Sequence, residues 1–174
     1  QLLDRAYAAR TIAIIADSGI DPADITLELT ETVFIDPRDE VDRALRSLRD
    51  AGVALAIDDF GSGYSSLGHL RRYPIDGLKV DTTYTQALLH DPDTRIITEA
   101  MVTMANRLGL HLVAEGVETV EELEVVTSLG IDAAQGYLLG RPGESLEVGM
   151  VDLPNLLARD DWLHRLARSP QSMP

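Results

Sequence analysis

Helical patterns that end at a glycine and lead into short apolar segments recur along this chain. Gly19, Gly52, Gly109 and Gly130 each close a helical pattern and precede an apolar segment. Glycine readily adopts the left-handed backbone that ends a helix. Helix–strand alternation of this kind predicts parallel strands joined by right-handed crossovers, and hence an α/β fold. The repeat fits an open doubly wound sheet or a closed eight-stranded barrel.

The hydrophobic pattern predicts the individual elements. Strands are expected over residues 25–29, 53–57, 78–81, 110–114 and within 131–139. Helices are expected over residues 2–18, 37–51, 65–72, 92–108, 120–129 and 154–167. Asp36, Asp91 and Thr119 are the expected N-caps, and Thr119 with Glu122 forms a capping box. No linker interrupts the pattern, so we predict one domain over residues 1–168 and a flexible tail over 169–174.

Charge and composition exclude several classes of protein. The 174 residues carry a net charge of -14, which disfavours binding to nucleic-acid polymers or anionic membranes. No apolar run approaches the ~20 residues of a membrane span. The chain lacks cysteine, which fits a cytoplasmic protein. Because it starts at Gln1, we expect it to be part of a longer protein, one that other domains could tether to a membrane.

Polar side chains stand where the predicted strands end. They are Glu28, Asp58, Asp59, Lys79, Asp81, Glu115 and Gln135. The carboxyl ends of parallel strands form one ligand-binding rim, so these side chains are expected at one mouth. That many carboxylates require a cation, and oxygen ligands favour Mg²⁺, Mn²⁺ or Ca²⁺. The alternative is that each acid caps a helix or pairs with a surface arginine.

Five motifs in order resemble the EAL-domain family of cyclic-di-GMP phosphodiesterases. They are Glu28-Leu29-Thr30-Glu31, the run Asp58-Asp59-Phe60-Gly61-Ser62-Gly63-Tyr64-Ser65-Ser66-Leu67, Leu78-Lys79-Val80-Asp81, Val113-Ala114-Glu115-Gly116-Val117-Glu118 and Ala134-Gln135-Gly136-Tyr137, followed by Gly140-Arg141-Pro142. The resemblance implies a modified (β/α)8 barrel with two divalent cations, Mg²⁺ or Mn²⁺, that hydrolyses cyclic-di-GMP to linear pGpG. A barrel needs ~250 residues, so we expect a partial barrel with about five of the eight strands.

The resemblance also implies a role for each residue of the site. Glu28, Asp58 and Asp59 correspond to metal ligands, and Lys79 and Glu115 to catalytic residues. Gln135, Asp81 and Glu118 correspond to residues that contact the ligand or support those that do, and Glu31 to the anchor of the loop over residues 60–66.

Two segments of the family have no counterpart here, namely the Glu-Ala-Leu strand and the next strand with its metal-binding asparagine. We therefore expect the parent protein to be the enzyme and this chain alone to be inactive. We also expect the chain to be dimeric or to be completed by other segments, with a second copy or upstream regulatory domains as partners. The alternatives are a non-catalytic module that binds cyclic-di-GMP or mediates dimerisation, and another Mg²⁺-dependent barrel of the enolase type.

Overall fold

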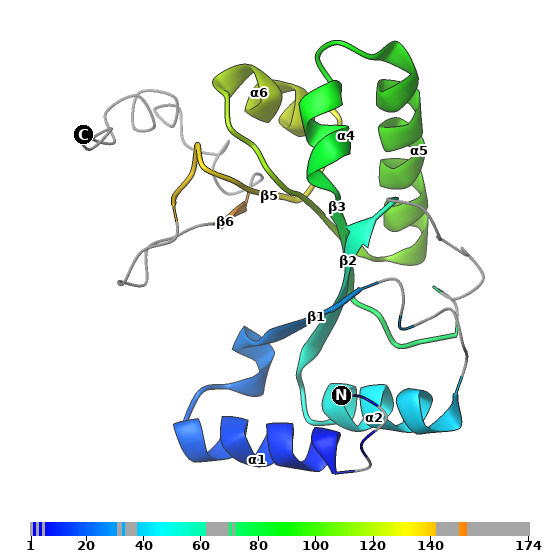
Figure 1. Ribbon diagram of the computed structural model, residues 1–174, viewed down its shortest axis with the longest axis vertical. Coiled ribbons are helices and arrows are strands. Elements are labelled where there is room, and N and C mark those ends of the chain that lie inside the picture. Colours follow the sequence, from blue (N-terminus) through cyan, green and yellow to red (C-terminus); the bar gives the residue numbers. More distant parts are fainter. Residues whose placement is uncertain are drawn as a thin grey trace. The chain divides into compact units, whose positions relative to one another are not determined.

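The computed structural model of the chain (Figure 1) describes residues 2, 4, 6–30, 33, 38–61, 70, 72–141 and 150–152. The chain divides into two compact units. The first comprises Gln1–Lys79 with Leu108–Leu110, and the second Val80–Arg107 with His111–Pro174. Within the described ranges, no helix combines the length and apolarity needed to cross a membrane.

The described part of the first unit includes two α-helices, one short 3-10 helix and three neighbouring strands. Its elements are α1 (Tyr7–Ser18), the short 3-10 helix η1 (Pro22–Asp24), β1 (Thr26–Thr30), α2 (Asp39–Asp50), β2 (Ala54–Phe60) and β3 (Gly77–Val80), whose last residue belongs to the second unit. β1 and β2 are parallel, with Thr26 opposite Ala54 and Thr30 opposite Asp58. β3 follows β2 in the sheet. The first unit is therefore built from crossover-connected strands, as the sequence predicts.

The apolar face of α2 supplies much of the first unit's core. Val41, Leu45 and Leu48 recur at helical spacing and are buried, with Leu45 fully inaccessible. Leu55 on β2 is also fully inaccessible. α1 packs against α2, as Figure 1 shows.

The described part of the second unit includes three helices and three neighbouring strands in addition to the end of β3. Its elements are α4 (Thr82–Ala87), α5 (Pro92–Leu108), β4 (His111–Ala114), α6 (Val120–Ser128), β5 (Ala133–Gln135) and β6 (Met150–Asp152). β4 and β5 are parallel, whereas β6 pairs with β5 in the antiparallel direction. The parallel pair confirms the α/β prediction, and the sequence patterns missed both α4 and β6.

An aspartate just before a strand binds the neighbouring strand in each unit. Asp76 precedes β3, accepts the Leu55 N–H at 3.0 Å through Oδ2, and donates its own N–H to the Leu55 carbonyl at 2.8 Å. Asp132 precedes β5 and makes the same pair of bonds with Leu112 of β4, at 2.8 and 3.1 Å. Leu55 and Leu112 are each the second residue of their strand. The two units therefore join the starts of adjacent strands in the same way.

Several predicted boundaries are wrong. α1 begins at Tyr7 rather than residue 2, and α2 begins at Asp39 with Arg38 as an N-cap that makes no side-chain cap. The strand expected over 78–81 ends at Val80. The helical spacing of Ile97, Met101 and Leu108 predicts one buried stripe on α5, which is partly wrong, because Ile97 and Leu108 are each 45% exposed.

Some predictions lie on residues that the structure does not describe. They are the helix over 154–167, the tail over 169–174, Glu31, Pro142, most of the helix over 65–72 and most of the loop over 60–66.

Candidate functional site

A buried lysine lies between two carboxylates in the first unit. The Lys79 Nζ atom is 2.8 Å from Glu28 Oε1 and 3.1 Å from Asp58 Oδ1. The lysine side chain is only 8% exposed, whereas the carboxylates are 45% and 26% exposed. The three residues therefore form a charged cluster that is buried on the lysine side and open to solvent on the carboxylate side.

The register of the sheet places this cluster. Glu28 lies opposite Ala56, and Asp58 follows two residues later on the same face of β2. The sequence prediction that strand-end residues meet is confirmed for these three side chains.

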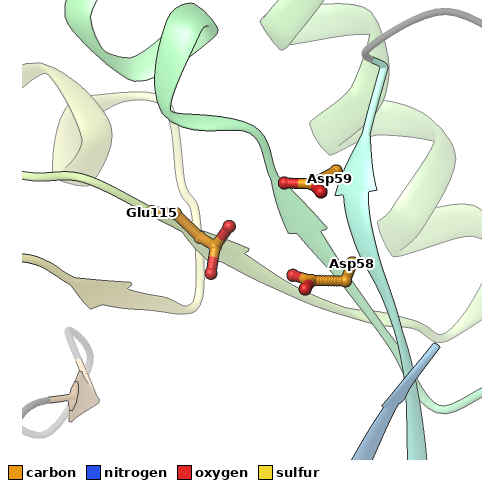
Figure 2. Close-up of side chains that lie close together, drawn as sticks. All are labelled: Asp58, Asp59 and Glu115. Atoms are coloured by element: carbon orange, nitrogen blue, oxygen red, sulfur yellow. The ribbon is translucent and has the colours of Figure 1, made fainter. Parts of the chain in front are cut away.

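A second carboxylate follows Asp58 directly. Asp58 and Asp59 each offer a carboxylate oxygen, and these oxygens lie within 4.8 Å of one another. Asp59 has a φ of 54°, the left-handed conformation that few residues other than glycine, asparagine and aspartate adopt. The strand thereby turns so that both adjacent carboxylates can serve one site, although side chains of successive strand residues normally point to opposite faces (Figure 2).

Asp58 provides an observation that tests whether a cation fits. Its Oδ1 atom is buried, and among the described residues no donor makes a hydrogen bond to it. The Lys79 ammonium is near it, at 3.1 Å, but outside hydrogen-bonding angles. A buried acceptor without a hydrogen bond is costly unless another group satisfies it. Carboxylate oxygens in this arrangement suit a hard divalent cation.

In the second unit, Glu115 follows β4 directly (Figure 2). Its backbone N–H donates to the Val80 carbonyl at 3.2 Å. Gly116 has a φ of 68°, and a Cβ there would overlap the Thr82 side chain. The backbone next to Glu115 can therefore pass this close to α4 only because residue 116 is a glycine.

The remaining predicted residues of the second unit have different surroundings. The Asp81 carboxylate accepts the Thr83 N–H at 2.8 Å and caps α4. From the sequence alone, Asp81 could serve either as such a helix cap or as a residue that contacts or supports the ligand. Gln135 is exposed at the end of β5, and its backbone carbonyl accepts the Val117 N–H at 3.1 Å. Glu118 is exposed.

The sequence reading overlooked the glycines that shape this unit. A Cβ at Gly136 would overlap the Val117 backbone, so the turn after β5 packs directly on the segment after β4. In the sequence, the two glycines stand in a Glu-Gly and a Gln-Gly pair, each at the end of an apolar strand. Such glycines mark places where another part of the chain approaches the backbone closely.

The family model described as EAL domain matches residues 1–142. The chain belongs to the EAL domain family.

Two relatives from Pseudomonas aeruginosa illustrate the similarity. The chain is 43% identical over 124 residues to the bifunctional diguanylate cyclase/cyclic di-GMP phosphodiesterase MucR, covering 71% of this chain and 18% of that protein. It is 38% identical over 143 residues to the cyclic di-GMP phosphodiesterase RocR, covering 82% and 36%. The chain therefore spans well under half the length of these curated relatives.

Solved structures agree on the fold. The EAL enzyme Bd1971, in its cAMP- and cyclic-di-GMP-bound form, matches with a TM-score of 0.78 at 30% identity, over 91% of this chain and 40% of that one. The manganese/cy-diGMP complex of Klebsiella pneumoniae BlrP1 matches with a TM-score of 0.72 at 38% identity, over 77% and 34%. The predicted fold, a partial (β/α)8 barrel of the EAL type, is confirmed.

Proposed function

We propose that this chain carries part of the active site of a cyclic-di-GMP phosphodiesterase, which hydrolyses the cyclic dinucleotide to linear pGpG. The observation that carries the proposal is the buried Lys79 between Glu28 and Asp58, beside the Asp58–Asp59 pair. The names of MucR and RocR support the substrate, since each describes a cyclic di-GMP phosphodiesterase.

We further propose that Glu28, Asp58 and Asp59 hold divalent cations, two in the complete site, with Mg²⁺ or Mn²⁺ as the working ions. The buried Asp58 Oδ1 without a hydrogen bond supports this assignment. The manganese in the BlrP1 complex supports the choice of ion. Paired cations, when bound, lower the pKa of a water and neutralise charge on a phosphate. They also explain how a chain with a net charge of -14 would accept an anionic ligand.

The side chains of this chain then have distinct tasks. Lys79 orients the attacking water and offsets negative charge on the phosphate; its side chain is only 8% exposed, so water screens its charge little. Glu115 contributes a further carboxylate to the metal and water cluster. Gln135, Asp81 and Glu118 contact or support the ligand, and Glu31 anchors the loop over residues 60–66. Water adds to phosphorus, the bond to one ribose 3′ oxygen breaks, and that oxygen takes up a proton.

The setting of the domain is part of the proposal. We propose that the parent protein acts in the cytoplasm in second-messenger signalling, as a homodimer or under the control of upstream regulatory domains. MucR supports the multidomain arrangement, because its name combines a cyclase and a phosphodiesterase. The missing family strands lead us to propose that this chain alone does not turn over substrate.

The test measures pGpG by chromatography after incubating cyclic-di-GMP with Mn²⁺. It compares this chain with the longer parent protein, each as wild type and as Glu115→Gln. We expect product from the wild-type parent only, and a loss of about 100-fold or more in its Glu115→Gln variant. No product from the wild-type parent would refute the phosphodiesterase proposal.

Calorimetry with Ca²⁺ and cyclic-di-GMP separates the second candidate function from the first. Binding by a parent protein that forms no pGpG would favour a non-catalytic cyclic-di-GMP-binding module. Neither binding nor product would leave a dimerisation role, which light scattering then tests.

A further inference from the structure

We propose that Glu122 is a positioning residue, which fixes the backbone at residues 118 and 119 and thereby the carboxylate of Glu118. The inference rests on the proposed function, because it assigns a task within that active site. It concerns a residue outside the strand-end set, one that the sequence marks only as part of a helix cap.

The Glu122 carboxylate is buried and binds two backbone groups at once. The residue is 7% exposed. Its Oε2 atom accepts the Glu118 N–H at 2.8 Å and the Thr119 N–H at 3.0 Å. A capping box requires only the second of these bonds, from the N-cap residue. The bond to Glu118 therefore extends beyond the helix to the segment that carries the proposed site residues.

Other contacts fix the same segment at its remaining positions. The Glu115 N–H donates to the Val80 carbonyl at 3.2 Å, and the Val117 N–H to the Gln135 carbonyl at 3.1 Å. The Val117 carbonyl in turn accepts the Leu138 N–H at 3.1 Å. Glu122 supplies the partner for the next two N–H groups, at residues 118 and 119. Four of the five backbone N–H groups over 115–119 thus have a defined acceptor.

Close packing prevents the segment from shifting to compensate. Gly116 lies so near Thr82 that a Cβ would overlap its side chain, and Gly136 lies equally near the Val117 backbone. If Glu122 is shortened, the Glu118 and Thr119 N–H groups lose their acceptor and must move toward water. Because the flanking residues are fixed, this movement falls on the Glu118 end of the segment.

Thr119 offers a matched control. Its Oγ1 accepts the Glu122 N–H at 3.2 Å, which is the other half of the same capping box. Thr119→Ala therefore weakens the cap of α6 and leaves the Glu122 carboxylate and its bond to Glu118 in place. A role limited to capping predicts similar effects of the two truncations, whereas a positioning role predicts different ones.

The experiment compares Glu122→Ala, Glu122→Gln and Thr119→Ala in the full-length parent protein. We expect Glu122→Ala to lower kcat about 10- to 100-fold with KM changed less than about threefold, as is typical when a supporting residue is lost. Glu122→Gln keeps an oxygen acceptor and should stay within about threefold of wild type. Thr119→Ala should lower the melting temperature to a similar extent as Glu122→Ala and retain kcat.

Equal losses of kcat in Glu122→Ala and Thr119→Ala would overturn the inference, because they would reduce Glu122 to a helix cap. Glu122→Asp, which is one methylene shorter, replaces Glu122→Ala if the latter does not fold.

Amide hydrogen exchange at residues 118 and 119 gives a readout that does not depend on activity. We expect faster exchange at both amides in Glu122→Ala than in Thr119→Ala. Unchanged exchange would refute the inference even if the wild-type enzyme is active. An inactive wild type would instead refute the proposed function.

Discussion

Replacing Lys79 by methionine tests the charged cluster directly. Methionine keeps most of the side-chain volume and removes the ammonium that lies 2.8 Å from Glu28 and 3.1 Å from Asp58. The two carboxylates would then face each other without the cation between them. We expect the free energy of unfolding to fall and the loss to depend on both carboxylates being ionised.

The magnitude follows from the distances and the exposure. At an effective dielectric constant of about 20, the two attractions are about 6 and 5 kcal/mol before solvation is counted. Burial of the ammonium offsets several kcal/mol of this, and Glu28 is 45% exposed and therefore screened by water. Because Glu28 is largely exposed, we expect a net loss of about 2 kcal/mol, below the roughly 3–5 kcal/mol typical of breaking a fully buried pair. With a urea m-value of about 2 kcal/mol/M, the unfolding midpoint should fall by about 1 M.

The assay is urea unfolding of the chain at pH 7 with a chelator, followed by circular dichroism. Glu28→Gln in the Lys79→Met background is the informative control, because it removes one of the repelling charges. It should recover about half of the loss, whereas Glu28→Gln alone should be destabilising. A midpoint shift below about 0.2 M, or no recovery in the double variant, would refute the reasoning.

Three further predictions concern other parts of the chain. Mn²⁺ at about 100 times its Kd should stabilise the parent protein by about 2.7 kcal/mol in thermal unfolding. Asp59→Asn should remove most of this gain, because asparagine tolerates the left-handed backbone but lacks the carboxylate. An unchanged gain in the variant would contradict the metal assignment. Gly116→Ala should cost about 2–4 kcal/mol in urea unfolding because of its positive φ and the overlap with Thr82, and Thr82→Ala should restore part of the loss; a neutral Gly116→Ala would contradict the packing argument. Hydrogen bonds from the Thr94 hydroxyl and from the Asp93 N–H lower the pKa of Asp91 below 3.8. The ionised carboxylate therefore stabilises the folded protein above that pH, and this stabilisation disappears as the pH falls through the folded-state pKa. Asp91→Ala should be less stable than wild type at pH 7, and a stability difference that persists in strong acid would contradict this account.

Local chemistry explains why much of the fold could be predicted from the sequence. The Asp91 and Thr119 caps are confirmed, because each depends on a side chain reaching a backbone N–H two or three residues away. The meeting of Glu28, Asp58 and Lys79 is also confirmed, because parallel strands bring their carboxyl ends to one edge.

Features that depend on distant neighbours could not be predicted. The helical period identifies the apolar positions of α5 but not which of them face the protein, so exposed Ile97 and buried Met101 look alike in the sequence. β6 has only three residues and pairs in the antiparallel direction, which no crossover pattern indicates. Asp81 fits both a strand end and a helix cap, and only the structure reveals the cap.

Asp76 and Asp132 also bear on how neighbouring parallel strands find their alignment. Hairpin strands are aligned by the tight turn between them, but parallel strands are separated by a long crossover that imposes no register. Each aspartate binds one residue of the adjacent strand through both a backbone and a side-chain bond, so a slip by one residue would break two bonds together. The alignment information thus lies in the residue just before the strand. A designer of parallel sheets could use one aspartate at this position to select a register without altering the buried strand sequence.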